Sequence, residues 1–80
     1  MNGSFKDDLA EFNYQVILAS EKCGYKENKV SKTQGFMVAL ALADRRFAEG
    51  GEKATVDELR APLDKDQIAA IKRFRDERGL

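Results

Sequence analysis

The 80-residue sequence contains no histidine, no tryptophan and only one cysteine, Cys23. Without histidine, the chain lacks the commonest general base and the commonest zinc ligand, and a single cysteine cannot form an intrachain disulfide. The glycine, cysteine and histidine spacings of phosphate-binding, dinucleotide-binding, zinc and metalloprotease motifs are also missing. We therefore expect a protein that is not an enzyme and that carries no metal or other cofactor.

Long apolar runs are missing as well. No stretch approaches the roughly 20 apolar residues that a membrane-spanning helix needs. The first residues, MNGSFKDDLAEF, lack the basic segment followed by an apolar core that defines a signal peptide. These features predict a cytoplasmic protein that makes no contact with a membrane.

Net charge is a third absence, because 14 basic and 14 acidic side chains balance. Such a balance argues against a general nucleic-acid binder and against an acidic mimic of nucleic acid. The charges nevertheless form blocks of −3, +4, −3 and +2 over residues 1–21, 22–48, 49–66 and 67–80. Alternating blocks suit contacts within the chain or between subunits, although scattered surface charge produces the same pattern.

Hydrophobic residues make up 42% of the chain, which is enough for a packed core. The pattern predicts a single all-α domain over residues 1–80, a small helical bundle of three main helices and one short helix. A chain of this size buries only about 60% of the surface that its unfolded form exposes, so a partner subunit would add stability. We therefore expect homodimerisation to complete the bundle.

The first helix is expected from near Phe5, behind a capping box of Ser4 and Asp7, to a left-handed cap at Gly24. An apolar stripe with alternating spacings of four and three runs along it and predicts its core face. The stripe consists of Phe5, Leu9, Phe12, Val16, Ala19 and Cys23. The β-branched and aromatic content of residues 14–19 leaves a strand as the local alternative.

The central helix is expected from about residue 32 to residue 48 or 49, opened by a capping box of Ser31 and Gln34. It is apolar on two sides. Its predicted contacts with the first helix are Phe36, Leu40 and Phe47, which leaves Val38 and Leu42 to meet the last helix or a second subunit. Asp44 is expected to pair with an arginine or to lie at the edge of the core, and a recognition patch of residues 44–46 is the alternative.

The second half of the chain has its own helix signals. Thr55 and Glu58 form a capping box for a short helix through about residue 60, and Pro62 prevents its continuation. Asp64 and Gln67 mark the start of a last helix over about residues 65–78, closed by Gly79. Asp64 is therefore interpreted as a helix cap rather than as part of an acidic metal motif.

The leading functional hypothesis is a small protein-binding module, such as an adaptor, regulator or inhibitor of the kind that phages and mobile elements encode. It rests on the absence of catalytic groups, on surplus apolar surface and on arginines at an apolar edge. The predicted partner-binding residues are Val38, Leu42, Arg45, Arg46, Arg75 and Arg78.

A DNA-binding regulator is the alternative, because residues 56–78 resemble a helix-turn-helix in outline. The turn carries Pro62 rather than glycine, and the basic residues lie late in the second helix, whereas base contacts usually come from its first turns. The lysines of residues 22–32 would then lie on the DNA backbone; otherwise they form a solvated loop.

Overall fold

The computed structural model describes the backbone of residues 4–80 and the side chains of residues 9–80. Its elements are α1 (Ser4–Cys23), α2 (Lys32–Leu42), the short 3-10 helix η1 (Arg45–Phe47), α3 (Val56–Arg60) and α4 (Lys65–Glu77). Every element in the described range is helical, which confirms the predicted all-α class. Residues 14–19 lie within α1, so the strand alternative is wrong. The expected box of Ser4 and Asp7 lies outside the described side chains.

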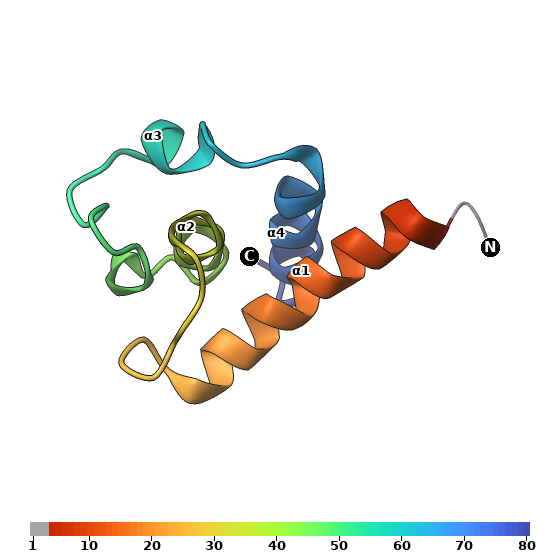
Figure 1. Cartoon of the computed structure of the whole chain (residues 1–80), viewed down its shortest axis with the longest axis horizontal. Coiled ribbons are helices and arrows are strands. Elements are labelled where there is room, and N and C mark those ends of the chain that lie inside the picture. The colour runs from red at the N-terminus through yellow and green to blue at the C-terminus, as the bar shows by residue number, and fades with distance from the viewer. Residues whose placement is uncertain (1–3) are drawn as a thin grey trace.

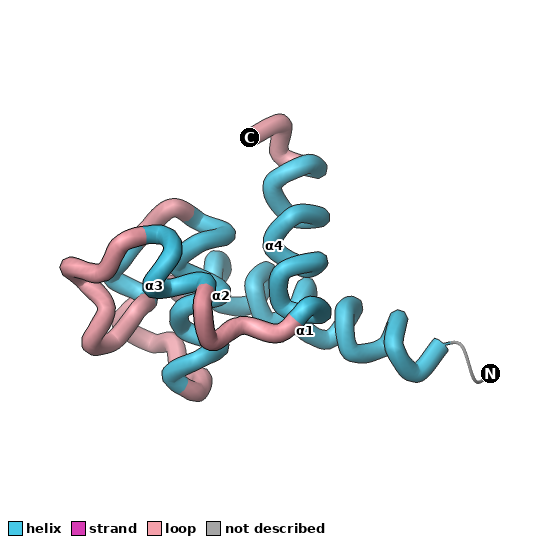
Figure 2. The backbone as a smooth tube through the Cα atoms, turned by 90° about the horizontal axis from the view of Figure 1, so that it is seen from above, coloured by secondary structure: helices cyan, strands magenta, loops and turns pink. Residues whose placement is uncertain are grey.

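The long helix α1 crosses the other helices instead of lining up with them. Figure 1 shows α1 running diagonally in front of α4, and Figure 2 shows α4 at a steep angle to it. The first turns of α1 extend beyond the rest of the molecule in both views. The first turns of α1 are therefore not covered by α2, α3 or α4.

Helices α2 and α4 lie side by side and point in the same direction. Near their N-termini, the side chain of Gln67 donates a hydrogen bond to that of Gln34 at 3.0 Å. Near their C-termini, the guanidinium of Arg75 donates to the carbonyl oxygen of Ala41 at 3.2 Å. Contacts at both ends fix the register of the pair.

The predicted helix starts are largely confirmed. Thr55 and Asp64 each form a full capping box with the residue three positions later. Ser31 accepts a hydrogen bond from the backbone N–H of Gln34, as expected, but the Gln34 side chain does not return to Ser31. The Gln34 side chain instead forms hydrogen bonds with residues of two other helices, Asn13 of α1 and Gln67 of α4.

A chain of side-chain amides joins α1, α2 and α4. The amide nitrogen of Gln34 donates to the oxygen of Asn13 at 3.1 Å, and Gln34 accepts from Gln67 through its own oxygen. Asn13 and Gln67 are buried, and no buried side-chain N or O atom of the described residues is left without a partner. A fully satisfied buried polar network specifies one arrangement of the helices that supply it.

The central helix ends earlier than the sequence predicts, at Leu42 rather than at residue 48 or 49. Ala43 adopts the left-handed conformation with φ of 55°, which breaks the helix. Asp44 then caps η1 by accepting from the backbone N–H of Arg46 at 3.0 Å, and its carboxylate also binds the Arg46 side chain. The expected pairing of Asp44 with an arginine is confirmed, and Phe47 belongs to η1 rather than to a continuation of α2.

The core is built around α2 and α4, with one side of α1 packed against them. Its buried hydrophobic residues are Ile17, Met37, Val38, Ala39, Ala41, Phe47, Ala48, Leu59, Ala70 and Phe74. The predicted contacts of the central helix are different from those observed: Leu40 faces α3 and α4, and Phe47 lies on η1, in edge-to-face contact with Tyr25. Gly35 lets η1 approach α2, because a Cβ there would lie 2.7 Å from the carbonyl oxygen of Phe47.

The predicted core face of α1 is wrong. Helix α1 turns Asn13, Ile17 and Ser20 inward, whereas Leu9 and Phe12 of the apolar stripe are 42% and 59% exposed. The inward polar groups are satisfied, since Asn13 joins the amide chain and Ser20 donates to Asn28 at 2.8 Å. The inward side of α1 combines these polar residues with the buried Ile17, and of the stripe Val16 packs against the core.

Candidate functional site

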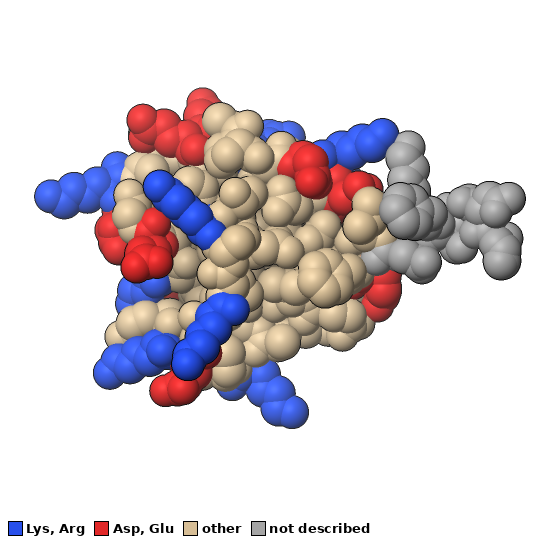
Figure 3. Space-filling view, viewed as in Figure 1, with Lys and Arg blue, Asp and Glu red and all other residues tan. Residues whose placement is uncertain are grey.

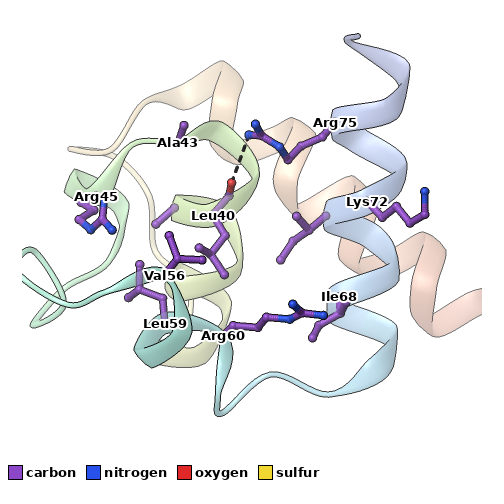
Figure 4. A pocket seen from close by; sticks show the side chains of 11 residues that line it. Leu40, Ala43, Arg45, Val56, Leu59, Arg60, Ile68, Lys72 and Arg75 are labelled. Atoms are coloured by element: carbon purple, nitrogen blue, oxygen red, sulfur yellow. Dashed lines mark hydrogen bonds between the residues drawn. The ribbon is translucent and has the colours of Figure 1, made fainter. Parts of the chain in front are cut away.

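An apolar groove lies between α2, α3 and α4, with a volume of about 520 Å³. Figure 4 shows Leu40, Val56, Leu59 and Ile68 directed into the space between the three helices. The complete lining is Ala39, Leu40, Ala43, Arg45, Val56, Leu59, Arg60, Ile68, Ile71, Lys72 and Arg75. Four of these residues are basic and none is acidic, so the groove combines an apolar floor with a positively charged rim.

The six arginines of the chain divide into two groups of three. Arg46, Arg73 and Arg78 form ion pairs with Asp44, Glu11 and Glu21, respectively. The remaining three form no ion pair with any carboxylate of the described residues, and all of them line the groove: Arg45, Arg60 and Arg75. Their positive charge is therefore not neutralised by a partner within the described chain.

Arg75 is positioned by the end of α2. Its guanidinium donates to the carbonyl oxygens of Ala41 and Leu40 at 3.2 and 3.5 Å, and Figure 4 shows the contact with Leu40. These carbonyls belong to the last turn of α2, where helix carbonyls lack partners and the dipole favours a cation. Arg75 is thus a half-buried helix cap that also borders the groove.

The other rim residues are more exposed. Arg45 donates to the carbonyl oxygen of Ala54 at 2.9 Å, which holds its side chain against the loop before α3. Arg60 reaches from α3 towards α4 across the mouth of the groove, whereas Lys72 points away from it (Figure 4). Lys72 is already paired with Asp76 at 2.8 Å. The groove charge therefore comes mainly from the three arginines.

The structure separates the predicted partner-binding residues into three environments. Arg45 and Arg75 border the groove, whereas Arg46 and Arg78 are held in ion pairs elsewhere. Leu42 is half-buried and packs against the core. Val38 is 0% exposed, since it faces inward one turn after Gln34, and no partner can reach it in this conformation.

The ion-paired arginines form contacts at the surface of the molecule, between helices or within one turn of the chain. Arg78 donates to both carboxylate oxygens of Glu21 at 2.6 and 2.7 Å and lies over the Phe74 ring. These hydrogen bonds hold the pKa of the Glu21 carboxyl below its ordinary value. Arg46 lowers the pKa of Asp44 in the same way, and its guanidinium lies 4.4 Å from the centre of the Tyr25 ring. Residues 44–46 are thus joined by a local ion pair.

Sequence reasoning did not find Arg60, Val56 or Ile68 as groove residues. Each comes from a different position along α3 or α4, and only the packing of the two helices against α2 brings them together. One sequence signal was present: Val56 is an apolar residue directly after a helix cap, where a polar side chain would serve the helix start equally well. The structure leaves this side chain 56% exposed.

The helix-turn-helix alternative meets an obstacle in the contacts of its basic residues. Arg73 is paired with Glu11 at 2.6 Å and lies over the Tyr14 ring, and Arg75 caps α2. These groups are not available for DNA phosphates without loss of internal contacts. The four lysines of residues 22–32, which run from the last turn of α1 to the first residue of α2, are exposed.

The described residues contain no group of three or more acidic, cysteine or histidine side chains that would hold a metal ion. Among the helices of the described part, none has the length and apolar character needed to cross a membrane. Comparison of the chain with protein-family models, with curated proteins and with solved structures finds no match. The groove is therefore the feature from which a function can be inferred.

Proposed function

We propose that this protein is a small non-enzymatic binding module, an adaptor, regulator or inhibitor, whose groove binds an acidic amphipathic helix of a partner protein. The observation that carries the proposal is the division of the arginines. All three that lack an ion pair within the described chain border the same apolar groove.

The shape and chemistry of the groove define the partner segment. Its apolar floor between three helices suits side chains spaced three or four residues apart on one face of a helix. Carboxylates beside that apolar face would meet Arg45 and Arg60, and an arginine at the edge of an apolar surface is a common anchor in protein interfaces. A basic segment would be repelled by the same rim.

Two synthetic helical peptides test the proposal. Both carry leucines every third or fourth position, and they differ only in having glutamates or lysines beside the leucines. Fluorescence anisotropy should show saturable binding of the glutamate peptide and none of the lysine peptide. Equal binding of both peptides, or no binding of either, would contradict the proposal.

A matched pair of charge reversals locates the binding surface. Arg60→Glu should weaken binding of the glutamate peptide roughly tenfold, because it replaces a favourable rim contact by repulsion. Lys53→Glu makes the same change of charge at an exposed lysine outside the groove lining and should leave binding unchanged. A gel shift with duplex DNA over a salt series separates the DNA-binding alternative, which predicts affinity that falls steeply with salt.

A further inference from the structure

Arg75 is the most buried of the three groove arginines that form no ion pair within the described chain. It is half-buried, whereas Arg45 and Arg60 are exposed. Both of its hydrogen bonds to the end of α2 come from one nitrogen, Nη1. Its Nε and Nη2 donate to no acceptor of the described residues, and these two nitrogens form one edge of the planar guanidinium. The side chain is therefore held in place with one edge free to bind a carboxylate through two parallel hydrogen bonds.

An arginine that is already held in position binds a carboxylate more tightly than a mobile one, because less side-chain entropy is lost when the contact forms. Partial burial strengthens the contact further, since less water surrounds the charges. Arginines in such places are common hot spots of protein interfaces. We therefore expect Arg75 to bind one particular carboxylate of a partner and not only to attract negative charge in general.

Arg60 lies at the opposite end of the groove. It is the last residue of α3, four positions before Asp64, the cap of α4, and its side chain is directed towards Ile68 near the start of α4 (Figure 4). Arg75 follows Ile68 by seven residues on the same helix, which is two turns or about 10 Å at 1.5 Å per residue. The two arginines therefore border the groove at positions about 10 Å apart along α4.

The floor between these two ends carries no charge. Leu40 from α2 and Ile71 from α4 line it, and none of the groove residues is acidic. On the face of the molecule drawn in Figure 3, charged side chains likewise lie mostly around a broad uncharged area. A carboxylate over the middle of the groove would lose water without gaining a partner, whereas one at either end would meet an arginine. The groove therefore favours a bound segment that is apolar in its centre and acidic on both sides of that centre.

We infer that Arg60 and Arg75 bind two carboxylates of the partner helix that lie two turns apart, an inference that rests on the proposed binding of an acidic helix in this groove. On a helix, residues at positions i and i+7 lie on one face and are separated by the same rise as Ile68 and Arg75. Leucines at i+3 and i+4 lie between these carboxylates, over the apolar floor. Arg75 is the residue that fixes the position of the partner along the groove.

Two peptides of identical composition test the spacing. Both carry leucines at i+3 and i+4 and a glutamate at i. The spaced peptide has its second glutamate at i+7, and the displaced peptide has it at i+5, on the opposite face of the helix. Fluorescence anisotropy should show about tenfold tighter binding of the spaced peptide. Equal affinities would overturn the spacing and leave the proposed function intact, whereas no binding of either peptide would contradict the proposed function as well.

Three variants assign the preference to particular arginines. Arg75→Lys keeps the charge but lacks the planar edge, so the tenfold preference for the spaced peptide should fall to threefold or less. Arg60→Gln should reduce the preference in the same way. Arg45→Gln is the matched control, because Arg45 is held to the loop before α3 and should contribute equally to both peptides.

The ratio of the two affinities is the deciding quantity, since a change in the stability of a variant affects both peptides alike. Arg45→Gln should weaken both peptides by the same factor and keep the ratio. A full preference in Arg75→Lys, or a preference lost in Arg45→Gln, would overturn the assignment of Arg75 as the anchor.

Discussion

The groove and the stripe of α1 are both apolar and exposed, but they are built in different ways. The groove is concave, takes residues from three helices and has a rim of arginines that form no ion pair with the carboxylates described in the structure. The stripe is convex and comes from one helix whose charges are used on its other side. A concave surface with a charged rim selects a partner by its charge and shape, whereas a convex apolar stripe offers no charge to select one.

If the groove and the stripe are the two exposed apolar surfaces, the apolar residues on the other side of α2 must be buried. Substitution of Val38 on that side should have the largest effect on stability. Val38→Asp should lower the free energy of unfolding by more than about 4 kcal/mol, because it buries a charge without a partner. Circular dichroism with urea titration should show a largely unfolded chain, since a chain of this size has only about 5–10 kcal/mol in total.

Val56→Asp is the matched control, because it makes the same change at an exposed residue. It should leave the free energy of unfolding within about 0.5 kcal/mol of the original. A folded and stable Val38→Asp protein would mean that α2 has a further exposed apolar side, which could bind a partner as well as the groove could.

The amide chain gives an intermediate effect and tests whether groove and stripe are held in one rigid arrangement. Gln34→Leu removes the partners of Asn13 and Gln67, both buried, so it should cost about 1–3 kcal/mol of unfolding free energy. Thermal unfolding should show a lower midpoint. Gln15→Leu makes the same change at an exposed position of α1 and should have little effect.

Two measurements sharpen this result. If Gln34→Leu were as stable as the original chain, the amide contacts would not matter for the packing of α1. If it is destabilised but binds the glutamate peptide with equal affinity, the groove is independent of how α1 is attached.

The smallest effect concerns the arginines with ion pairs. Glu11, Glu21 and Asp44 have pKa values lowered chiefly by hydrogen bonds from Arg73, Arg78 and Arg46, respectively. A carboxyl with a lower pKa in the folded state adds stability above its unfolded pKa, and this contribution is lost as pH falls through the folded pKa. Lowering the pH below about 4 should therefore lower the melting temperature slightly.

Arg78→Gln separates this contribution from general acid effects. The variant lacks the partner of Glu21, so its melting temperature should decline less than that of the original chain as the pH falls from neutral to below about 4. Arg60→Gln removes an arginine without an ion pair and should keep the original pH dependence. Identical pH profiles for all three proteins would show that the ion pairs do not contribute.

Much of the fold follows from local rules that the sequence displays. The caps at Thr55 and Asp64 lie where short side chains precede glutamate or glutamine by three residues, because that chemistry acts within one turn. The end of α2 was missed because Ala43 is an ordinary helix former that adopts a left-handed conformation here. No local pattern distinguishes that case from a continuing helix.

The faces of the helices were harder to predict than their existence. The inward side of α1 is partly polar, and the partners of Asn13 lie on helices far along the chain. Arg45 and Arg75 were recognised as rim residues of an apolar surface, but their separation from Arg46 and Arg78 depends on which carboxylates the fold brings near. Such pairing between residues far apart in the sequence cannot be predicted from the spacing of residues along one helix.

The methyl group of Ala43 has two opposing effects, one on the backbone of the turn and one on the wall of the groove. Its left-handed backbone is strained by about 1 kcal/mol in any residue with a Cβ, and glycine would relieve that strain. Yet the same residue is part of the groove wall. A glycine at this position would relieve the strain of the turn but would remove a methyl group from the groove wall, so the sequence here keeps the groove wall at a cost in stability.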